Sequence, residues 1–397
     1  MGATLATVAS ILKEVYEDQI REQLDDSTVA LKRIEKSSEG ITSEVGGKYV
    51  SFPIHTRRNS GIGARNEGEA LPNPGQQGHA GARVPLKYLY GGIQLTGQTI
   101  ELAEKNYQAF ASTLDTEVNG LKDDLAKDQN RMVYGDATGV LAKVTADAAN
   151  QITVDNPQYL LLDMMIDVYA ADLVTLRVSN RQITSLDPDT GVLTYSGADA
   201  SATIIAGDVL VRTGNLNREW SGFGIAIKNT GIYQNINPAT EPVWKSVIRA
   251  NGGVARALSE GLMIELVDAI RKNGGKTTAI FSNLGVRRAY FNLLVQQRQY
   301  VGTKEFGGGF TGLSFTTDQG EVPFVVDVDC PPKKAYFVNE KSFTFYREGD
   351  WGWMDRDGSM WSRVQGFDAY EARMFQYSEI GCHRRNSNGV LDDLIEG

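Results

Sequence analysis

The chain has 397 residues, of which 41% are hydrophobic and 22% are charged, so it can bury two or three packed units and has a globular composition. Its formal net charge of −9 argues against a protein that wraps nucleic acid by neutralising phosphates, which needs clustered Lys and Arg. With 2 cysteines and 3 histidines it has little material for a disulfide framework or a zinc site.

The N-terminal segment, MGATLATVASILKEVYEDQI, lacks the basic start and the long apolar run of a signal peptide. Apolar stretches such as residues 159–166 are too short to span a bilayer. We therefore expect a soluble protein, made in a reducing cytoplasm, that does not enter a membrane. Cys330 and Cys382 are expected to be buried or incidental thiols.

Residues 4–37 are predicted to form a charged helical arm, because apolar residues recur there at mostly helical intervals. Such an apolar stripe must pack against something. The sequence leaves open whether this is the arm's own domain or a neighbouring subunit.

Two predicted strands follow, KYVSFPI and RVPLKYLYGGIQL, with β-branched and aromatic residues in near alternation. Between them lie about thirty residues crowded with Gly, Pro, Asn and Gln, whereas connections in compact domains are typically ~4–6 residues long. Such a stretch buries too little apolar surface to hold its own shape. We predict a two-stranded arm that leaves its own domain and is ordered by another chain, since an isolated hairpin is marginal in water.

The strongest helix signal covers residues 99–134, with Thr99 as the N-cap and Gly135 as the terminator. Gly120 within it predicts a kink or a close packing contact. A helix of this length is expected to act as a spine.

Short strand signals recur between residues 141 and 233 and predict a small antiparallel β unit inserted into a larger domain. Within it, LLDMMIDVYAADL is interpreted as one helix and FGIAIKN as a strand. Residues 242–300 are interpreted as helical around the strand KTTAIFSN, and residues 313–378 as strands alternating with turns. Helices and strands are segregated rather than in regular βαβ order, which predicts an α+β fold.

Two glycine-rich segments resemble nucleotide-binding motifs only in part. NGGKTT lacks the earlier glycine of a phosphate-binding loop and is better explained by a helix that ends at Gly274 before a strand. GGGFTG at residues 307–312 neither follows a strand nor opens a helix, so we interpret it as a flexible loop.

No other motif indicates catalysis, and we predict no catalytic residues, no cofactor and no metal. The aromatic cluster of Trp351, Trp353 and Trp361 could stack a sugar or a base, but packing on its own sheet or on a neighbour is the favoured interpretation. Adjacent acids are interpreted as solvated residues and not as catalytic dyads. These are Asp25–Asp26, Asp123–Asp124 and Asp392–Asp393.

The segment around the long loop carries more basic than acidic residues. This excess either keeps the loop soluble or pairs it with acidic surface on an adjacent subunit, and the sequence supports both interpretations. The basic residues are Lys48, Arg57, Arg58, Arg65, Arg83 and Lys87, against Glu67 and Glu69.

The order of these parts resembles the tailed-bacteriophage major capsid protein family with the Hong Kong 97-like fold. The tail FDAYEARMFQYSEIGCHRRNSNG is similar to the closing strand of that family, and AGDVLVRTGN with GFGIAI resembles a β insertion found in some members. The resemblance implies an N-terminal arm, an extended β-hairpin loop, a peripheral domain with a long spine helix, an axial domain and a β-rich insertion. The arm corresponds to residues 1–45 and the extended loop to residues 46–98. The peripheral domain corresponds to residues 99–140 with 333–378, the axial domain to residues 236–332 with 379–397, and the β-rich insertion to residues 141–235.

The resemblance implies a structural, non-enzymatic role: self-assembly through hexamers and pentamers into an icosahedral shell around phage double-stranded DNA, without sequence-specific DNA binding. Expected partners are further copies of the chain, portal and scaffold proteins and a decoration protein, in a virion capsid assembled in the host bacterial cytoplasm. For contacts between subunits we select four loop residues with two acidic acceptors. These are Arg57, Arg58, Arg65 and Glu69, with Glu101 and Asp124.

Two departures from the family pattern matter. The chain passes directly from Met1 into the arm, so we expect no scaffolding segment and no N-terminal processing. Residues 49–86 contain no Lys, so the Lys–Asn cross-link of some members is not expected at the loop tip, and would need Lys48 or Lys87.

Two alternatives stay open. An encapsulin-type nanocompartment shell resembles the same fold and would bind a cargo peptide in its lumen instead of packaging DNA. A carbohydrate-binding or hydrolytic protein would use residues 141–233 and the Trp cluster.

Overall fold

The computed structural model describes residues 29–37, 49–98, 107–298, 313–355 and 358–397. The chain forms two compact units, which we call the main unit (residues 1–130 with 226–397) and the barrel unit (residues 131–225). Most of the predicted N-terminal arm lies outside the described residues. Its described end consists of helix α3 (Val29–Arg33) and strand β1 (Glu35–Ser37).

The first sheet of the main unit is organised around β19 (Ala369–Cys382), a strand of 14 residues. Strand β4 (Lys87–Thr96) pairs antiparallel with most of β19, and the shorter strands pair along its other edge. β1 extends the sheet in parallel to β16. The shorter strands are β16 (Phe343–Arg347), β17 (Gly352–Trp353) and β18 (Trp361–Arg363).

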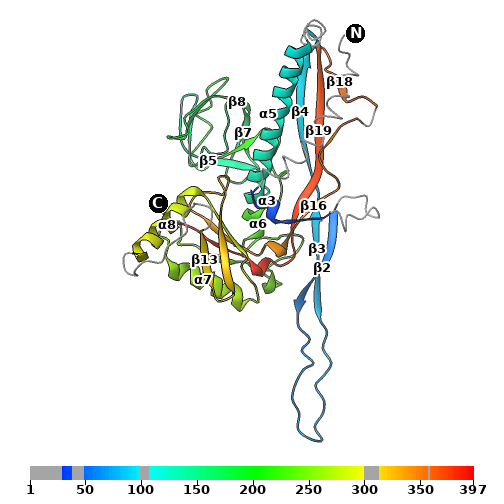
Figure 1. Ribbon diagram of the computed structural model, residues 1–397, viewed down its shortest axis with the longest axis vertical. Helices are drawn as coiled ribbons and strands as arrows, with labels where there is room; N and C mark the ends of the chain where they lie inside the picture. Colours follow the sequence, from blue (N-terminus) through cyan, green and yellow to red (C-terminus); the bar gives the residue numbers. More distant parts are fainter. Residues whose placement is uncertain (1–28, 38–48, 99–106, 299–312, 356–357) are drawn as a thin grey trace. The chain divides into compact units, whose positions relative to one another are not determined.

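Helix α5 (Tyr107–Tyr134) lies along this sheet (Figure 1), and 28 residues of the predicted spine are confirmed as helix. Leu121 and Leu125 of α5 contact β4 at Gly91, where an added Cβ would lie 3.0 Å from both side chains. Small residues at this point therefore allow the helix to approach the strand closely.

The Trp cluster lies in the core of this layer. Trp351, Trp353 and Trp361 are 3%, 4% and 6% exposed, and they belong to one cluster with Val118 of α5 and Met374 of β19. The interpretation that these side chains pack on their own sheet is confirmed.

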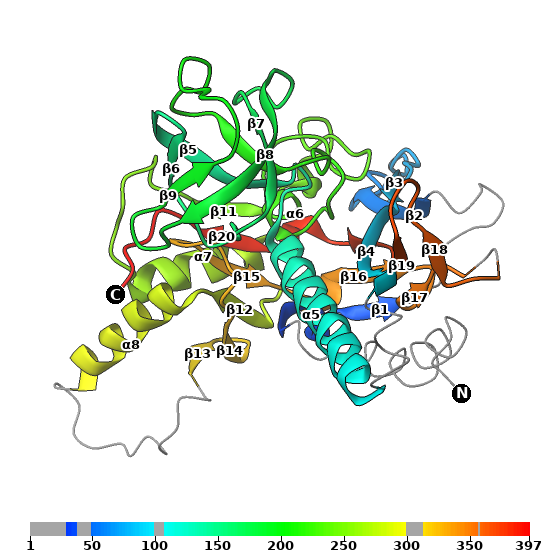
Figure 2. The same cartoon turned by 90° about the horizontal axis from the view of Figure 1, so that it is seen from above.

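The second sheet of the main unit has the order β11-β20-β15-β12-β14-β13. Helices α7 (Glu260–Lys272) and α8 (Leu284–Arg298) lie beside it (Figure 2), and their apolar faces share its core. The strands are β11 (Val247–Arg249), β12 (Ala279–Ser282), β13 (Ser314–Thr317), β14 (Gly320–Val326), β15 (Ala335–Val338) and β20 (Gly389–Leu391).

The predicted end of a helix at Gly274 is confirmed, because α7 ends at Lys272 and Gly274 has a φ of 77°. The expectation of continuous helix from residue 242 is wrong: residues 242–259 contain a short 3-10 turn (Pro242–Trp244), strand β11 and glycines with positive φ. The GGGFTG segment lies outside the described residues.

The barrel unit is a closed barrel of antiparallel strands in the order β10-β5-β6-β9-β8-β7. Apolar side chains from all of these strands fill it, so it is a packed core and not a channel. The strands are β5 (Val140–Ala148), β6 (Gln151–Val154), β7 (Met165–Tyr169), β8 (Leu176–Leu186), β9 (Val192–Tyr195) and β10 (Val209–Arg212).

Two element predictions in this region are wrong. The segment LLDMMIDVYAADL, interpreted as one helix, contains strand β7 instead. Asp163 has a φ of 64°, and the short apolar run after it is buried as a strand, with Ile166 and Val168 at 0% and 1% exposure. FGIAIKN contains the short helix α6 (Phe223–Ala226) instead of a strand. A short apolar run has no periodicity that separates a buried strand from a helix.

The hairpin consists of β2 (Tyr49–Arg57) and β3 (Gly78–Pro85), which form a two-stranded sheet of their own. The predicted two-stranded arm is thus present. Its second strand is shorter than expected, because the chain passes at Leu86 from β3 into β4 and joins the first sheet.

Candidate assembly surface

The base of the hairpin packs on the rest of the main unit. Val50 and Val84 face Tyr346 in a small apolar core, and the Phe52 ring lies 4.2 Å from the His383 ring between centroids. His383 Nε2 lies 3.0 Å from the Tyr346 hydroxyl, and burial lowers the pKa of His383. The chain's own residues therefore hold the base of the hairpin.

Two polar contacts join the hairpin to the segment of residues 226–246. The backbone N–H of Arg83 donates to the Gln234 carbonyl at 3.0 Å, and Arg57 Nη2 donates to Glu241 Oε1 at 2.7 Å. The hydrogen bond from Arg57 lowers the pKa of Glu241. Arg57 was selected as a contact to another subunit, and it has an ion-pair partner within its own chain.

The segment of residues 226–246 is itself fixed by Arg385, which is 0% exposed. Its guanidinium donates to the carbonyls of Ala226 at 2.8 Å and Trp244 at 3.4 Å, and lies 5.2 Å from the centroid of the Tyr233 ring. A guanidinium carries five N–H donors in a fixed fork, so one side chain can hold several carbonyls. Burial lowers the pKa of Arg385.

Between the two strands, residues 58–77 form a segment that we call the tip loop, which contains no helix or strand. Figure 1 shows it continuing from β2 and β3 away from the first sheet. Its end is braced locally: Glu69 accepts hydrogen bonds from Asn66 N at 3.0 Å and Asn66 Nδ2 at 2.8 Å, and Arg65 Nε donates to the Ala70 carbonyl at 2.9 Å. These bonds lower the pKa of Glu69. Two of the selected charged residues thus shape the loop itself.

The tip loop also presents apolar side chains to solvent. Ile62 is 86% exposed and Leu71 is 83% exposed, the highest values of any large apolar side chain in the described residues. Charged residues of this loop were selected as contacts from the sequence, whereas its two aliphatic residues among Gly, Pro and Asn were not.

A second apolar surface lies on the first sheet, on the face opposite α5. Tyr88 and Tyr90 of β4 stand across from Tyr377 and Phe375 of β19, with 4.9 Å between the Tyr88 and Tyr377 ring centroids. Tyr88 is 53% exposed and Tyr90 is 55% exposed. We call this group of four rings the aromatic face.

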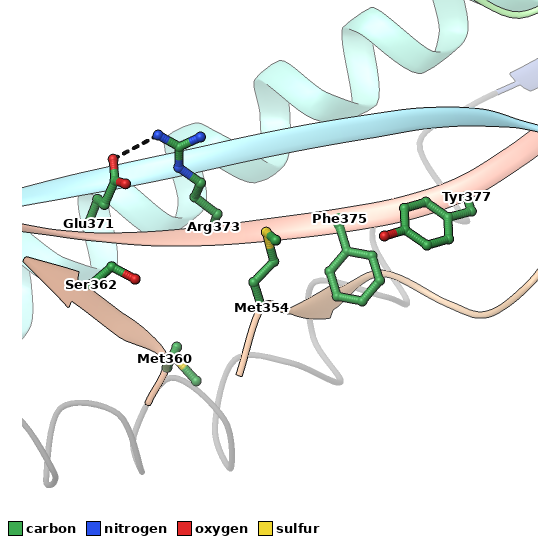
Figure 3. Close-up of a pocket in the computed structure, with 7 residues that line it drawn as sticks. All are labelled: Met354, Met360, Ser362, Glu371, Arg373, Phe375 and Tyr377. Carbon is green, nitrogen blue, oxygen red and sulfur yellow. Dashed lines mark hydrogen bonds and ion pairs between the residues drawn. The ribbon is translucent and has the colours of Figure 1, made fainter. Parts of the chain in front are cut away.

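A recess of about 480 Å³ adjoins the aromatic face, and Figure 3 shows its lining along β19. Arg373 Nη2 donates to Glu371 Oε2 at 2.9 Å at one end, and Met354 lies next to Phe375 further along the strand. The other lining residues are Met360, Ser362 and Tyr377. Apolar rings and thioethers beside one ion pair suit contact with protein better than binding of a charged small molecule.

The remaining selected residues are placed as follows. Arg58 and Asp124 are exposed, whereas Glu101 lies outside the described residues. The selection of these six residues as inter-subunit contacts stays a prediction.

In the described part of the chain, no three or more His, Cys, Asp and Glu side chains gather into a possible metal site, and no helix is apolar and long enough to cross a membrane.

Comparisons with known proteins point to one class. Residues 198–389 match the family model described as SU10 major capsid protein. The cyanophage A-1(L) capsid asymmetric unit aligns with a TM-score of 0.57 and 15% sequence identity, covering 91% of this chain and 90% of that chain. Comparison with curated protein sequences gives no match.

Two further solved structures align less well. The capsid of the native GTA particle has a TM-score of 0.48 and 11% identity, covering 92% of this chain and 90% of that chain. The capsid of Myoviridae phage XM1 has a TM-score of 0.44 and 10% identity, covering 93% and 91%.

The family match and the likeness to the cyanophage capsid agree with the α+β arrangement of long hairpin, spine helix and β19 sheet. The predicted capsid fold is confirmed. The family match over residues 198–389 and the capsid fold together support a major capsid protein of the tailed-phage class that forms the capsid shell.

Proposed function

We propose that the chain assembles through hexamers and pentamers into an icosahedral shell that encloses double-stranded DNA, and that the tip loop and the aromatic face are buried against neighbouring copies. The shell would form in the host bacterial cytoplasm with portal and scaffold proteins. The observation that carries this proposal is the exposure of Ile62 and Leu71 on a loop that has no core of its own. Exposed apolar patches of this kind mark protein contacts.

The energetics favour many weak contacts. A two-stranded hairpin is marginal in water, so its far end gains order when a neighbour covers it. Each such contact is repeated around a closed symmetric shell, and multivalency stabilises the whole without any strong single interface. The net charge of −9 leaves the DNA inside such a shell contained and not tightly bound.

The division of the chain into capsid domains belongs to the same proposal. We assign residues 99–140 and 333–378 to a peripheral domain, 236–332 and 379–397 to an axial domain, and 141–235 to a β-rich insertion. The closed barrel of β5 to β10 supports an insertion that folds as one unit, with room on its surface for a decoration protein. The match to a phage capsid family model favours this reading over an encapsulin-type shell.

The test replaces residues 58–77 by a two-residue Asn-Gly turn, which suits a short hairpin. We expect the intact chain to sediment as shells or as hexamers and pentamers, and the shortened chain to fold but to form far fewer shells. Electron microscopy of the same fractions identifies the particles. Shells at undiminished yield from the shortened chain would exclude a role for the tip loop, and an intact chain that stays monomeric would contradict the assembly itself.

A further inference from the structure

Two of the three histidines of the chain face each other across the hairpin. His55 on β2 pairs directly with His79 on β3, and their ring centroids lie 5.4 Å apart with 61° between the ring planes. This is the last regular rung before the register shifts between His55 and Arg57. Both side chains are exposed, so the rings can turn without disturbing a core.

An amide oxygen adjoins the histidine pair. Gln77, the last residue of the tip loop before β3, has its Oε1 2.6 Å from His55 Nε2. Imidazole nitrogens are preferred ligands of Zn²⁺, Cu²⁺ and Ni²⁺. A metal about 2.0–2.1 Å from each nitrogen places two imidazole centroids roughly 5 Å apart in tetrahedral geometry. The separation of the His55 and His79 rings matches this spacing.

We propose that His55 and His79, with Gln77 Oε1 as a third ligand, bind a divalent transition metal of the zinc class and clip the two strands together at the root of the tip loop. The remaining coordination positions would be taken by water or by a neighbouring copy. A metal that binds only the paired strands stabilises them by mass action. The bound metal would therefore stabilise the pairing of β2 and β3 at the end where the two-stranded sheet continues into the tip loop.

The third histidine gives a matched control. His383 packs against Phe52 and Tyr346 at the base of the hairpin, and it is not part of the proposed clip. The substitutions His55→Asn and His79→Asn change exposed side chains, so both variants are expected to fold. The control variant His383→Gln retains both His55 and His79, the two imidazole ligands of the proposed clip.

The experiment is titration of the full chain with Zn²⁺ by calorimetry, together with Cu²⁺ electron paramagnetic resonance. We expect one Zn²⁺ per chain. The substitutions His55→Asn and His79→Asn each remove a direct ligand, so each should weaken Zn²⁺ binding by at least about 10- to 100-fold, the loss seen when an outer-shell partner of a metal ligand is removed. The Cu²⁺ spectrum should show coupling to two imidazole nitrogens in the unmodified chain and in His383→Gln, and to at most one in His79→Asn.

Hydrogen exchange supplies an independent readout. Zn²⁺ should slow amide exchange in β2 and β3 of the unmodified chain and have no such effect in His79→Asn. Unchanged Zn²⁺ affinity in the double variant His55→Asn with His79→Asn would overturn the proposal, because the ion would then bind elsewhere. Loss of binding in His383→Gln alone would overturn it as well.

Discussion

Arg57 Nη2 donates to Glu241 Oε1 across 2.7 Å, and this ion pair joins the far end of β2 to the segment just before the 3-10 turn at Pro242–Trp244. The Arg57 side chain is 68% exposed and that of Glu241 is 16% exposed, so water screens the pair. Its consequence is therefore local. The pair restricts the direction of the hairpin relative to the segment of residues 226–246, and contributes little to the stability of the whole chain.

The first prediction concerns this pair. Glu241→Gln should leave the melting temperature nearly unchanged but speed amide exchange at Arg83, whose N–H bonds to the carbonyl of Gln234 in the same segment of residues 226–246. The matched control is Glu348→Gln, an exposed carboxylate outside the hairpin. Hydrogen exchange followed by mass spectrometry measures the difference. Equal exchange rates in both variants would show that the ion pair does not hold the hairpin.

The second prediction is a pH dependence. Burial lowers the pKa of His383 below its ordinary value of 6.5, although the Glu35 carboxylate partly opposes this. As the pH falls, His383 of the unfolded chain is therefore protonated before His383 of the folded chain. The contribution of His383 to the unfolding free energy is full above about pH 6.5 and decreases until the pH passes below the lowered pKa. Melting temperatures between pH 8 and pH 5 should fall less steeply in His383→Gln. An identical slope would show that another group causes the loss.

The third prediction concerns a buried ion pair in the barrel unit. Arg131 donates from Nη1 and Nη2 to both carboxylate oxygens of Glu219 at 2.8 Å, and the two side chains are 8% and 4% exposed. Glu219→Ala leaves a buried guanidinium without this partner and should cost about 3–5 kcal/mol of unfolding free energy. Urea denaturation of unassembled chain measures it. Asp350→Ala, which breaks the exposed pair with Arg347, should cost at most about 1 kcal/mol. Similar costs for both would contradict the argument from burial.

The fourth prediction separates the apolar from the charged part of the tip loop. Ile62→Ser with Leu71→Ser should reduce shell yield severalfold while leaving the fold intact, because both side chains are already exposed in the single chain. The conservative pair Ile62→Val with Leu71→Met keeps the apolar surface and should assemble normally. Sedimentation gives the yields. If the serine variant assembled as well as the conservative one, these two residues would not be contacts.

Much of the fold could be predicted from local pattern. Alternation in KYVSFPI and the Gly- and Pro-rich stretch after it predicted the hairpin, and helical spacing predicted α5. The barrel strand β7 could not be distinguished from a helix, since its burial depends on strands far along the chain. The passage from β3 to β4 at Leu86 likewise depends on β19, more than 270 residues later, because that strand recruits only the second part of RVPLKYLYGGIQL.

The six residues selected as inter-subunit contacts stay a prediction, but the structure shows how several of them are placed. Arg57, Arg65 and Glu69 were selected as inter-subunit contacts because of their charge, and each has a hydrogen-bond partner in its own chain. The pairing of Arg57 has no local signal in the sequence, since its partner is 184 residues away, whereas Arg65 and Glu69 bond to residues five and three positions away. Ile62 and Leu71 are further candidates for such contacts, because an exposed aliphatic side chain in a loop without a core has nothing of its own to pack on.

The most direct test of the assembly model is a cryo-electron microscopy reconstruction of particles formed by the intact chain, with the path of residues 58–77 traced. We expect closed shells in which Ile62 and Leu71 are buried against a different copy of the chain. Shells in which this loop touches only its own chain, or remains in solvent, would contradict the model.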